Sequence, residues 1–77
     1  MSIEDFNSLP EQRKKEIIVD AIKVAEHEED IVKFELFRID NFFVEVSRSI
    51  IKRFRKVTNT YLPNNLPAIY ANRLVNK

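Results

Sequence analysis

The chain has 77 residues, of which 44% are hydrophobic, and a formal net charge of +1. This length allows a single small domain, residues 1–77, whose core is barely large enough for independent folding. Because the sequence contains neither cysteine nor glycine, it excludes disulfides, thiolate metal sites, cysteine nucleophiles and the glycine-rich loops that bind phosphates or dinucleotides.

The charge is divided unevenly along the chain. Residues 1–40 carry eleven acidic and six basic side chains, whereas residues 41–77 carry one acidic and seven basic side chains. Such an asymmetry fits a nucleic-acid surface, but it fits equally two halves that lie against each other or against the opposite half of a partner copy. We favour packing of the halves over nucleic-acid binding.

The sequence predicts a cytoplasmic protein. The first five residues include two acids and no base, and no strictly apolar run is longer than three residues. Both features argue against a signal peptide and against a membrane span.

The first predicted element is an amphipathic helix that begins near Leu9. Ser8 and Glu11 have the spacing of a capping box, and Pro10 is tolerated in a first helical turn. At 100° per residue, one apolar stripe is formed by Ile17, Ile18, Ala21 and Ile22. From Ile22 onward the residues also alternate as a strand would, and periodicity alone does not separate a helix extension from a strand. We predict a strand over residues 22–28.

An antiparallel hairpin is predicted for residues 31–46. Apolar and polar side chains alternate on both sides of Asp40-Asn41, two residue types that tolerate the left-handed conformation of a tight turn. The expected core face then pairs Ile39 with Phe42, Phe37 with Val44, and Glu35 with Val46. The opposite face carries large apolar groups and needs a cover.

A further strand is predicted for residues 50–57, after a turn near Arg48-Ser49. Asn65-Leu66-Pro67 repeats the cap, apolar, proline order of Ser8-Leu9-Pro10 and predicts a short helix over residues 66–75. One side of that helix would carry Leu66, Ile69, Tyr70 and Leu74. The predicted fold class is α+β, with an N-terminal helix, an antiparallel meander of three to four strands and a short C-terminal helix.

The order of these elements resembles a known group. The chain contains, in this order, Leu9-Pro10-Glu11, an amphipathic helix, Val24-Ala25-Glu26 before an acidic turn, and the run from Phe42 to Val46. Over residues 6–57 this order resembles small uncharacterised bacterial proteins that have an N-terminal helix and an antiparallel meander. The resemblance supports a strand from Ile22 to Glu28 and implies no activity. The tight turn of that group typically carries Asp-Gly, whereas this chain has Asp-Asn.

We find no catalytic, cofactor-binding or metal-binding motif and predict a non-enzymatic protein without a cofactor. His27 is the only histidine, and in a strand its neighbours Glu26 and Glu28 point to the opposite face, so we interpret it as a surface histidine. Glu45 is the only acid of the second half, and we expect it to pair with Lys52 across two strands. A buried Glu45 without a cation would instead be a candidate general acid or base.

The leading hypothesis is an association domain that forms a homodimer or binds another protein. Both faces of the hairpin carry large apolar groups, and two short helices cover little more than one face. The residues expected at the interface, or under the second helix, are Phe34, Leu36 and Phe43.

The alternative hypothesis is nucleic-acid binding through the basic segment 48–56. Phosphate neutralisation and base stacking would use Arg48, Lys52, Arg53, Phe54, Arg55 and Lys56. A charged edge strand with Phe54 in the core explains the same residues, and we favour that explanation.

Overall fold

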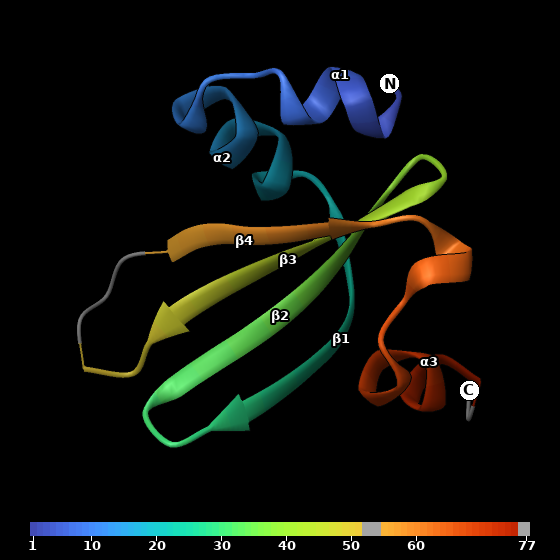
Figure 1. The fold of residues 1–77 in the computed structure, drawn as a ribbon. Coiled ribbons are helices and arrows are strands. Elements are labelled where there is room, and N and C mark those ends of the chain that lie inside the picture. Colours follow the sequence, from blue (N-terminus) through green and yellow to red (C-terminus); the bar gives the residue numbers. More distant parts are fainter. Residues whose placement is uncertain (52–54, 76–77) are drawn as a thin grey trace.

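The computed structural model describes residues 1–51 and 55–75, which form helices around one four-stranded sheet (Figure 1). The elements are α1 (Ile3–Asn7), α2 (Glu11–Val19), β1 (Ile22–Glu29), β2 (Val32–Ile39), β3 (Phe42–Ser49), β4 (Arg55–Tyr61), a 3-10 turn (Pro63–Asn65) and α3 (Ala68–Val75). Every strand pair is antiparallel, and the spatial order is β1-β2-β3-β4. The predicted α+β meander is therefore confirmed, and so is the strand expected from Ile22.

The N-terminal region differs from the prediction because two helices replace one. The Ser2 hydroxyl accepts a hydrogen bond from the Asp5 amide at 3.1 Å, and the Asp5 carboxylate accepts one from the Ser2 amide, which makes a capping box for α1. Ser8 ends α1, and α2 begins after Pro10 with no side-chain cap. The predicted capping box of Ser8 with Glu11 is therefore wrong.

The β2–β3 hairpin has the predicted turn and register. Ile39 lies opposite Phe42, and the other pairs expected from a two-residue turn are all present. Asp40 has a φ of 50°, and Asp30 in the β1–β2 turn has a φ of 55°. Aspartate therefore occupies the left-handed position that glycine usually takes in such turns.

The fourth strand lies later in the chain than predicted. β3 continues to Ser49, where a turn was expected, because Ser49 still pairs with Val32. Ile50 and Ile51, which suggested the start of a strand, precede β4 and are exposed. Residues 52–54 of the predicted strand lie outside the described residues, and residues 55–57 do form the start of β4. The β3–β4 pairing also contains a bulge, at Thr58.

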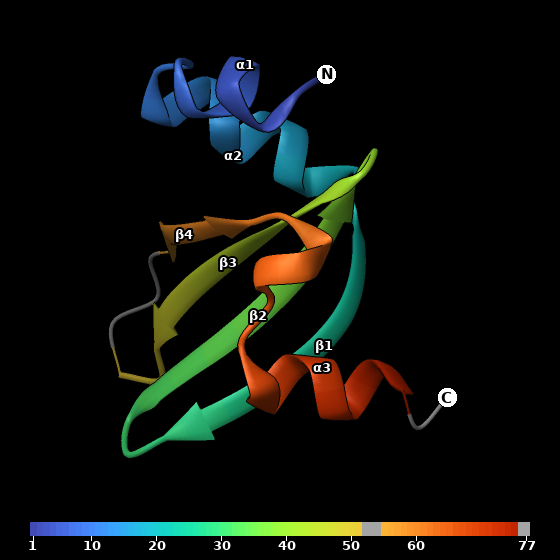
Figure 2. The same ribbon diagram turned by 45° about the vertical axis from the view of Figure 1, so that its right-hand side comes forward.

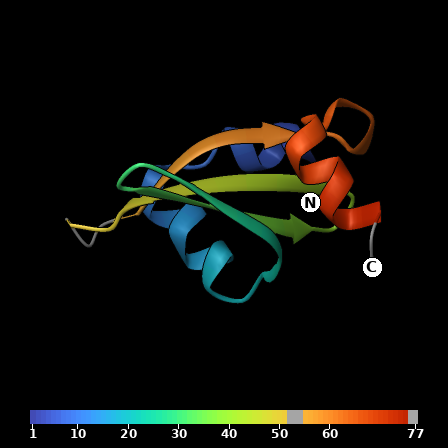
Figure 3. The same cartoon turned by 90° about the horizontal axis from the view of Figure 1, so that it is seen from below.

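The helices pack on opposite faces of the sheet. The face that we call the α2 face contains the core, made by Phe6, Ile18, Phe37, Phe42, Val44 and Val46. Its four strand residues belong to the predicted core face, whereas Phe6 was not predicted. The other face, the α3 face, packs against Tyr70, which is 1% exposed. In Figure 2, α1 and α2 lie together at one end of the sheet and α3 lies apart from them. Figure 3 shows the strands as a curved layer, with α2 and α3 well separated on it.

Candidate functional site

One row of charged side chains crosses all four strands on the α2 face. The register places Glu28 opposite Lys33, Lys33 opposite Arg48, and Arg48 opposite Arg55. Directly paired residues share a face, so these side chains project on the same side of the sheet. We call Lys33, Arg48 and Arg55 the basic row. Because neighbouring strands are ~4.8 Å apart, the row spans only ~10 Å.

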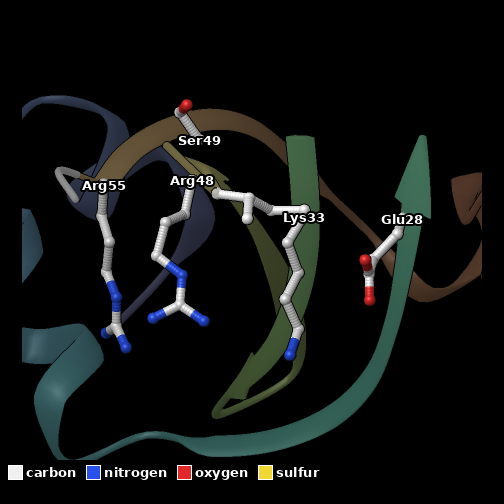
Figure 4. A pocket seen from close by; sticks show the side chains of 6 residues that line it. Glu28, Lys33, Arg48, Ser49 and Arg55 are labelled. Carbon is white, nitrogen blue, oxygen red and sulfur yellow. The ribbon is translucent and has the colours of Figure 1, made fainter. Parts of the chain in front are cut away.

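The basic row lines an open hollow of about 670 Å³, together with Glu28, Ser49 and Ile50. Figure 4 shows Arg48 and Arg55 side by side, with both guanidinium groups pointing the same way. The Ser49 hydroxyl points away from them. The charge of the hollow is therefore predominantly positive.

Lysines, and not the two arginines, neutralise the Glu26 carboxylate. Lys23 Nζ lies 2.7 Å from Glu26 Oε1, and Lys33 Nζ lies 3.5 Å from the same oxygen. The hydrogen bond from Lys23 lowers the pKa of the Glu26 carboxyl group. Arg48 and Arg55 form no ion pair with any residue in the described ranges 1–51 and 55–75. Two guanidinium groups, which stay charged at every physiological pH, are thus available to an anion.

Glu35 occupies the same face and is almost completely buried. It is 4% exposed, and Lys23 Nζ lies 3.4 Å from its Oε2. Its Oε1 has no hydrogen-bond partner within the described part of the chain. Arg48 and Arg55 therefore do not neutralise the Glu35 carboxylate by direct contact.

Glu45 is buried on the α3 face, where neutral groups bind it. The Tyr70 hydroxyl donates to Oε2 at 2.5 Å, while the Thr58 hydroxyl and the Asn59 amide donate to Oε1 at 3.0 and 3.1 Å. Asn59 takes the position opposite Glu45 in β4, which the prediction gave to Lys52, a residue outside the described ranges. Burial, followed by the hydrogen bond to Glu45, raises the pKa of the Tyr70 phenol, so Tyr70 stays protonated at neutral pH.

His27 is packed, which corrects the prediction of a surface histidine. Its side chain is 8% exposed, and its ring stacks on Phe34 with the ring centroids 4.9 Å apart. The Tyr70 ring meets it edge-on at 5.3 Å, and Glu29 Oε2 lies 3.6 Å from Nδ1. These aromatic partners come from β2 and α3, so the sequence around His27 contained no sign of them.

The residues predicted for a protein interface all lie on the α3 face. Leu36 is fully buried within the single chain, whereas Phe34 and Phe43 are half-buried. The chain's own C-terminal helix covers part of this face, as one of the two sequence interpretations expected. An interface through Phe34 and Phe43 stays a prediction.

The segment predicted to bind nucleic acid is divided between the two faces. Arg48 and Arg55 belong to the basic row, but Lys56 lies opposite Ser47 on the α3 face. The remaining predicted residues, which lie outside the described ranges, are Lys52, Arg53 and Phe54. Lys33, the third cation of the row, was missed. The hairpin register alone places Lys33 beside Arg48. Placing Lys33 in one row with Arg55 also requires the β3–β4 register, which the sequence did not predict.

No family model matches the chain, and no curated protein and no solved structure matches it. None of the described helices is long and apolar enough to cross a membrane. The described residues also contain no group of three histidine, cysteine, aspartate or glutamate side chains that could hold a metal ion.

Proposed function

We propose that this domain is a non-enzymatic binding module that captures an acidic segment of a partner protein on its basic row. The observation that carries the proposal is the pair of Arg48 and Arg55, which line one hollow in parallel and have no carboxylate partner among the described residues. Guanidinium groups bind carboxylates through paired, charge-assisted hydrogen bonds. A cationic hollow also concentrates anionic partners and speeds their association.

The surroundings of the row favour a short acidic peptide over nucleic acid. Glu28 ends the row, and the exposed acid Asp30 follows in the β1–β2 turn, so a long phosphate backbone that crosses the sheet meets repulsion. Among the described residues, no aromatic side chain lines the hollow for base stacking. A peptide that covers only the β3 and β4 side avoids the acids.

A binding role rather than catalysis is part of the proposal. Three buried titratable groups, Glu45, His27 and Tyr70, lie on the α3 face, away from the hollow. Glu35 is also buried and lies on the α2 face, but it is bound by Lys23 and does not line the hollow. A phenol whose pKa is raised does not give up its proton near neutral pH, which makes Tyr70 a poor general acid. We also propose that the chain belongs to the group of small bacterial proteins, which the order of its helices and strands supports. A cytoplasmic location is the last part of the proposal.

Fluorescence anisotropy with a labelled oligoglutamate peptide tests this function. We expect binding at low ionic strength that weakens as salt is added, because the contact is electrostatic. The double variant Arg48→Ala/Arg55→Ala should bind at least about tenfold more weakly, since each charge-assisted hydrogen bond contributes roughly 1.5–3 kcal/mol. Lys56→Ala removes one charge from the α3 face and is the matched control. No binding by the wild type, or equal binding by the double variant, would contradict the proposal.

Nucleic-acid binding is the second candidate, because it would use the same two arginines. Single-stranded RNA and DNA oligonucleotides with the same number of charges as the peptide are titrated alongside it. We expect weaker binding than to the peptide. Tighter binding to an oligonucleotide, lost in the arginine double variant, would replace the acidic-peptide proposal by this alternative.

A further inference from the structure

A second hollow, of about 320 Å³, lies between α2 and the strands β3 and β4. Its lining consists of Lys15, Ile18, Val19, Val46, Arg55 and Val57. Arg55 also lines the hollow of the basic row, so the two hollows are immediate neighbours. We call the second one the apolar hollow.

The apolar hollow combines hydrophobic walls with positive charge. Ile18 and Val46 are core residues, 4% and 2% exposed, whereas Val19 is 76% exposed. Neither Lys15 nor Arg55 has an ion pair within the part of the chain that the structure describes. A recess with aliphatic walls and only positive charges in its described lining fits an aliphatic group that stands next to an anion.

We propose that the apolar hollow takes one bulky aliphatic side chain of the acidic segment that binds the basic row. This inference rests on the proposed function. A volume of about 320 Å³ leaves ample room for one bulky aliphatic side chain. Arg55 stands between the two hollows and binds a carboxylate adjacent to that side chain, while Arg48 binds the next one. The recognised segment is thus an aliphatic residue flanked by acidic residues.

Two labelled peptides of equal charge test the inference. One is Asp-Glu-Leu-Glu-Asp, and the other has alanine in place of leucine. We expect the leucine peptide to bind about tenfold more tightly, because leucine has about three more carbon groups to bury than alanine. The gain is smaller than for full burial, because part of the side chain stays exposed in an open hollow. In ¹H–¹⁵N spectra, the Val19 and Val57 amide signals should shift with the leucine peptide and stay in place with the alanine peptide.

The variant Val19→Ser removes part of the apolar wall at a position exposed enough to leave the core intact. It should reduce the preference for leucine to about threefold, and the affinity for the alanine peptide should not change. Its amide spectrum serves as the control for folding.

The possible results separate the two proposals. Equal affinity for the two peptides overturns the aliphatic pocket and leaves the acidic-partner function in place. The absence of binding by either peptide overturns both. A leucine preference that Val19→Ser does not reduce, with no shift of the Val57 signal, shows that leucine binds elsewhere and overturns the pocket.

Discussion

A buried carboxylate is unfavourable unless its oxygens are well bound, and Glu45 meets this condition through hydrogen bonds alone. Its donors are Thr58 and Asn59 of β4 and Tyr70 of α3. Tyr70 is also the side chain that meets the His27 ring. The network therefore fastens the C-terminal helix to the sheet.

The variant Tyr70→Phe removes the shortest of these hydrogen bonds and keeps the aromatic ring. We expect the free energy of unfolding to fall by about 1–3 kcal/mol, because the Glu45 Oε2 atom loses its donor in a buried position. Urea denaturation measures the change. Tyr61→Phe is the matched control, since the described residues show no hydrogen bond of the Tyr61 hydroxyl to Glu45. An unchanged stability of Tyr70→Phe would contradict the structural role.

The pH dependence of the same variant gives a second readout. Burial raises the pKa of Tyr70 above its ordinary value of 10.0. Above pH 10 the unfolded chain releases this proton while the folded chain keeps it, so the stabilisation is complete below pH 10 and decreases as the pH rises above that value. The stability difference between the wild type and Tyr70→Phe should therefore shrink above pH 10. A constant difference through this range would argue against the buried phenol.

The turns show how the elements connect without glycine. Asp30 and Asp40 each open a two-residue turn with φ of 55° and 50°. An L-residue pays about 1–2 kcal/mol for this conformation, although aspartate is among the residues that tolerate it best. The Asp40 carboxylate additionally binds the Met1 amine at 2.6 Å, whereas no hydrogen bond of the Asp30 side chain is found among the described residues.

Asp30→Gly should therefore stabilise the fold by about 0.5–1 kcal/mol, because glycine adopts positive φ without the clash of a Cβ atom. Thermal denaturation followed by circular dichroism measures the gain. Asp40→Gly is the comparison, and its gain should be smaller because the contact with the Met1 amine is lost. A lower melting temperature for Asp30→Gly would show that its side chain stabilises the turn.

The elements that the sequence predicts well are those whose contacts are local. The β2–β3 register follows from alternation and one two-residue turn, since both strands lie next to that turn. The helix α1 was missed although Ser2 and Asp5 have capping-box spacing, because five residues are too few for an apolar stripe. β4 was misplaced because Ile50 and Ile51 have the composition of a strand while β3 still pairs with β2 at Ser49.

The candidate site was predicted only in part for the same reason. Arg48 and Arg55 were noted as basic residues, but their alignment depends on a register that the bulge at Thr58 interrupts. The partners of His27 and Glu45 depend on how α3 packs on the sheet, and no short sequence pattern predicts that packing. Long-range packing, rather than residue type, decides which charges meet.

In the whole molecule, part of the charge that is divided along the sequence lies at opposite edges of the sheet. Glu28 and Glu29 lie on the edge strand β1, whereas Arg55 and Lys56 lie on the edge strand β4. These edge charges therefore do not neutralise each other within the chain. Under the proposed function, an acidic partner docks on the β4 side, where Arg55 lies.

Self-association, the leading expectation from the sequence, stays a proposal, and the structure suggests a different surface for it. Leu36 is buried in the single chain, whereas Ile31, Ile50 and Ile51 are 52%, 56% and 71% exposed. Ile31 and Ile50 are neighbours, because the Ile50 amide donates to the Ile31 carbonyl at 2.8 Å. We call these three residues the isoleucine end. Such an exposed apolar group is typical of an interaction surface.

We expect the isoleucine end to support a weak homodimer, since three side chains bury far less than the ~800 Å² per partner of a stable interface. In sedimentation equilibrium the mass should rise with concentration from the 9.2 kDa of one chain toward twice that value. Ile31→Asp/Ile51→Asp should abolish this rise. Ile22→Asp, at the far end of β1 and 69% exposed, is the matched control and should not. A mass that stays at one chain, or equal loss in the control, would remove the isoleucine end as a dimer surface.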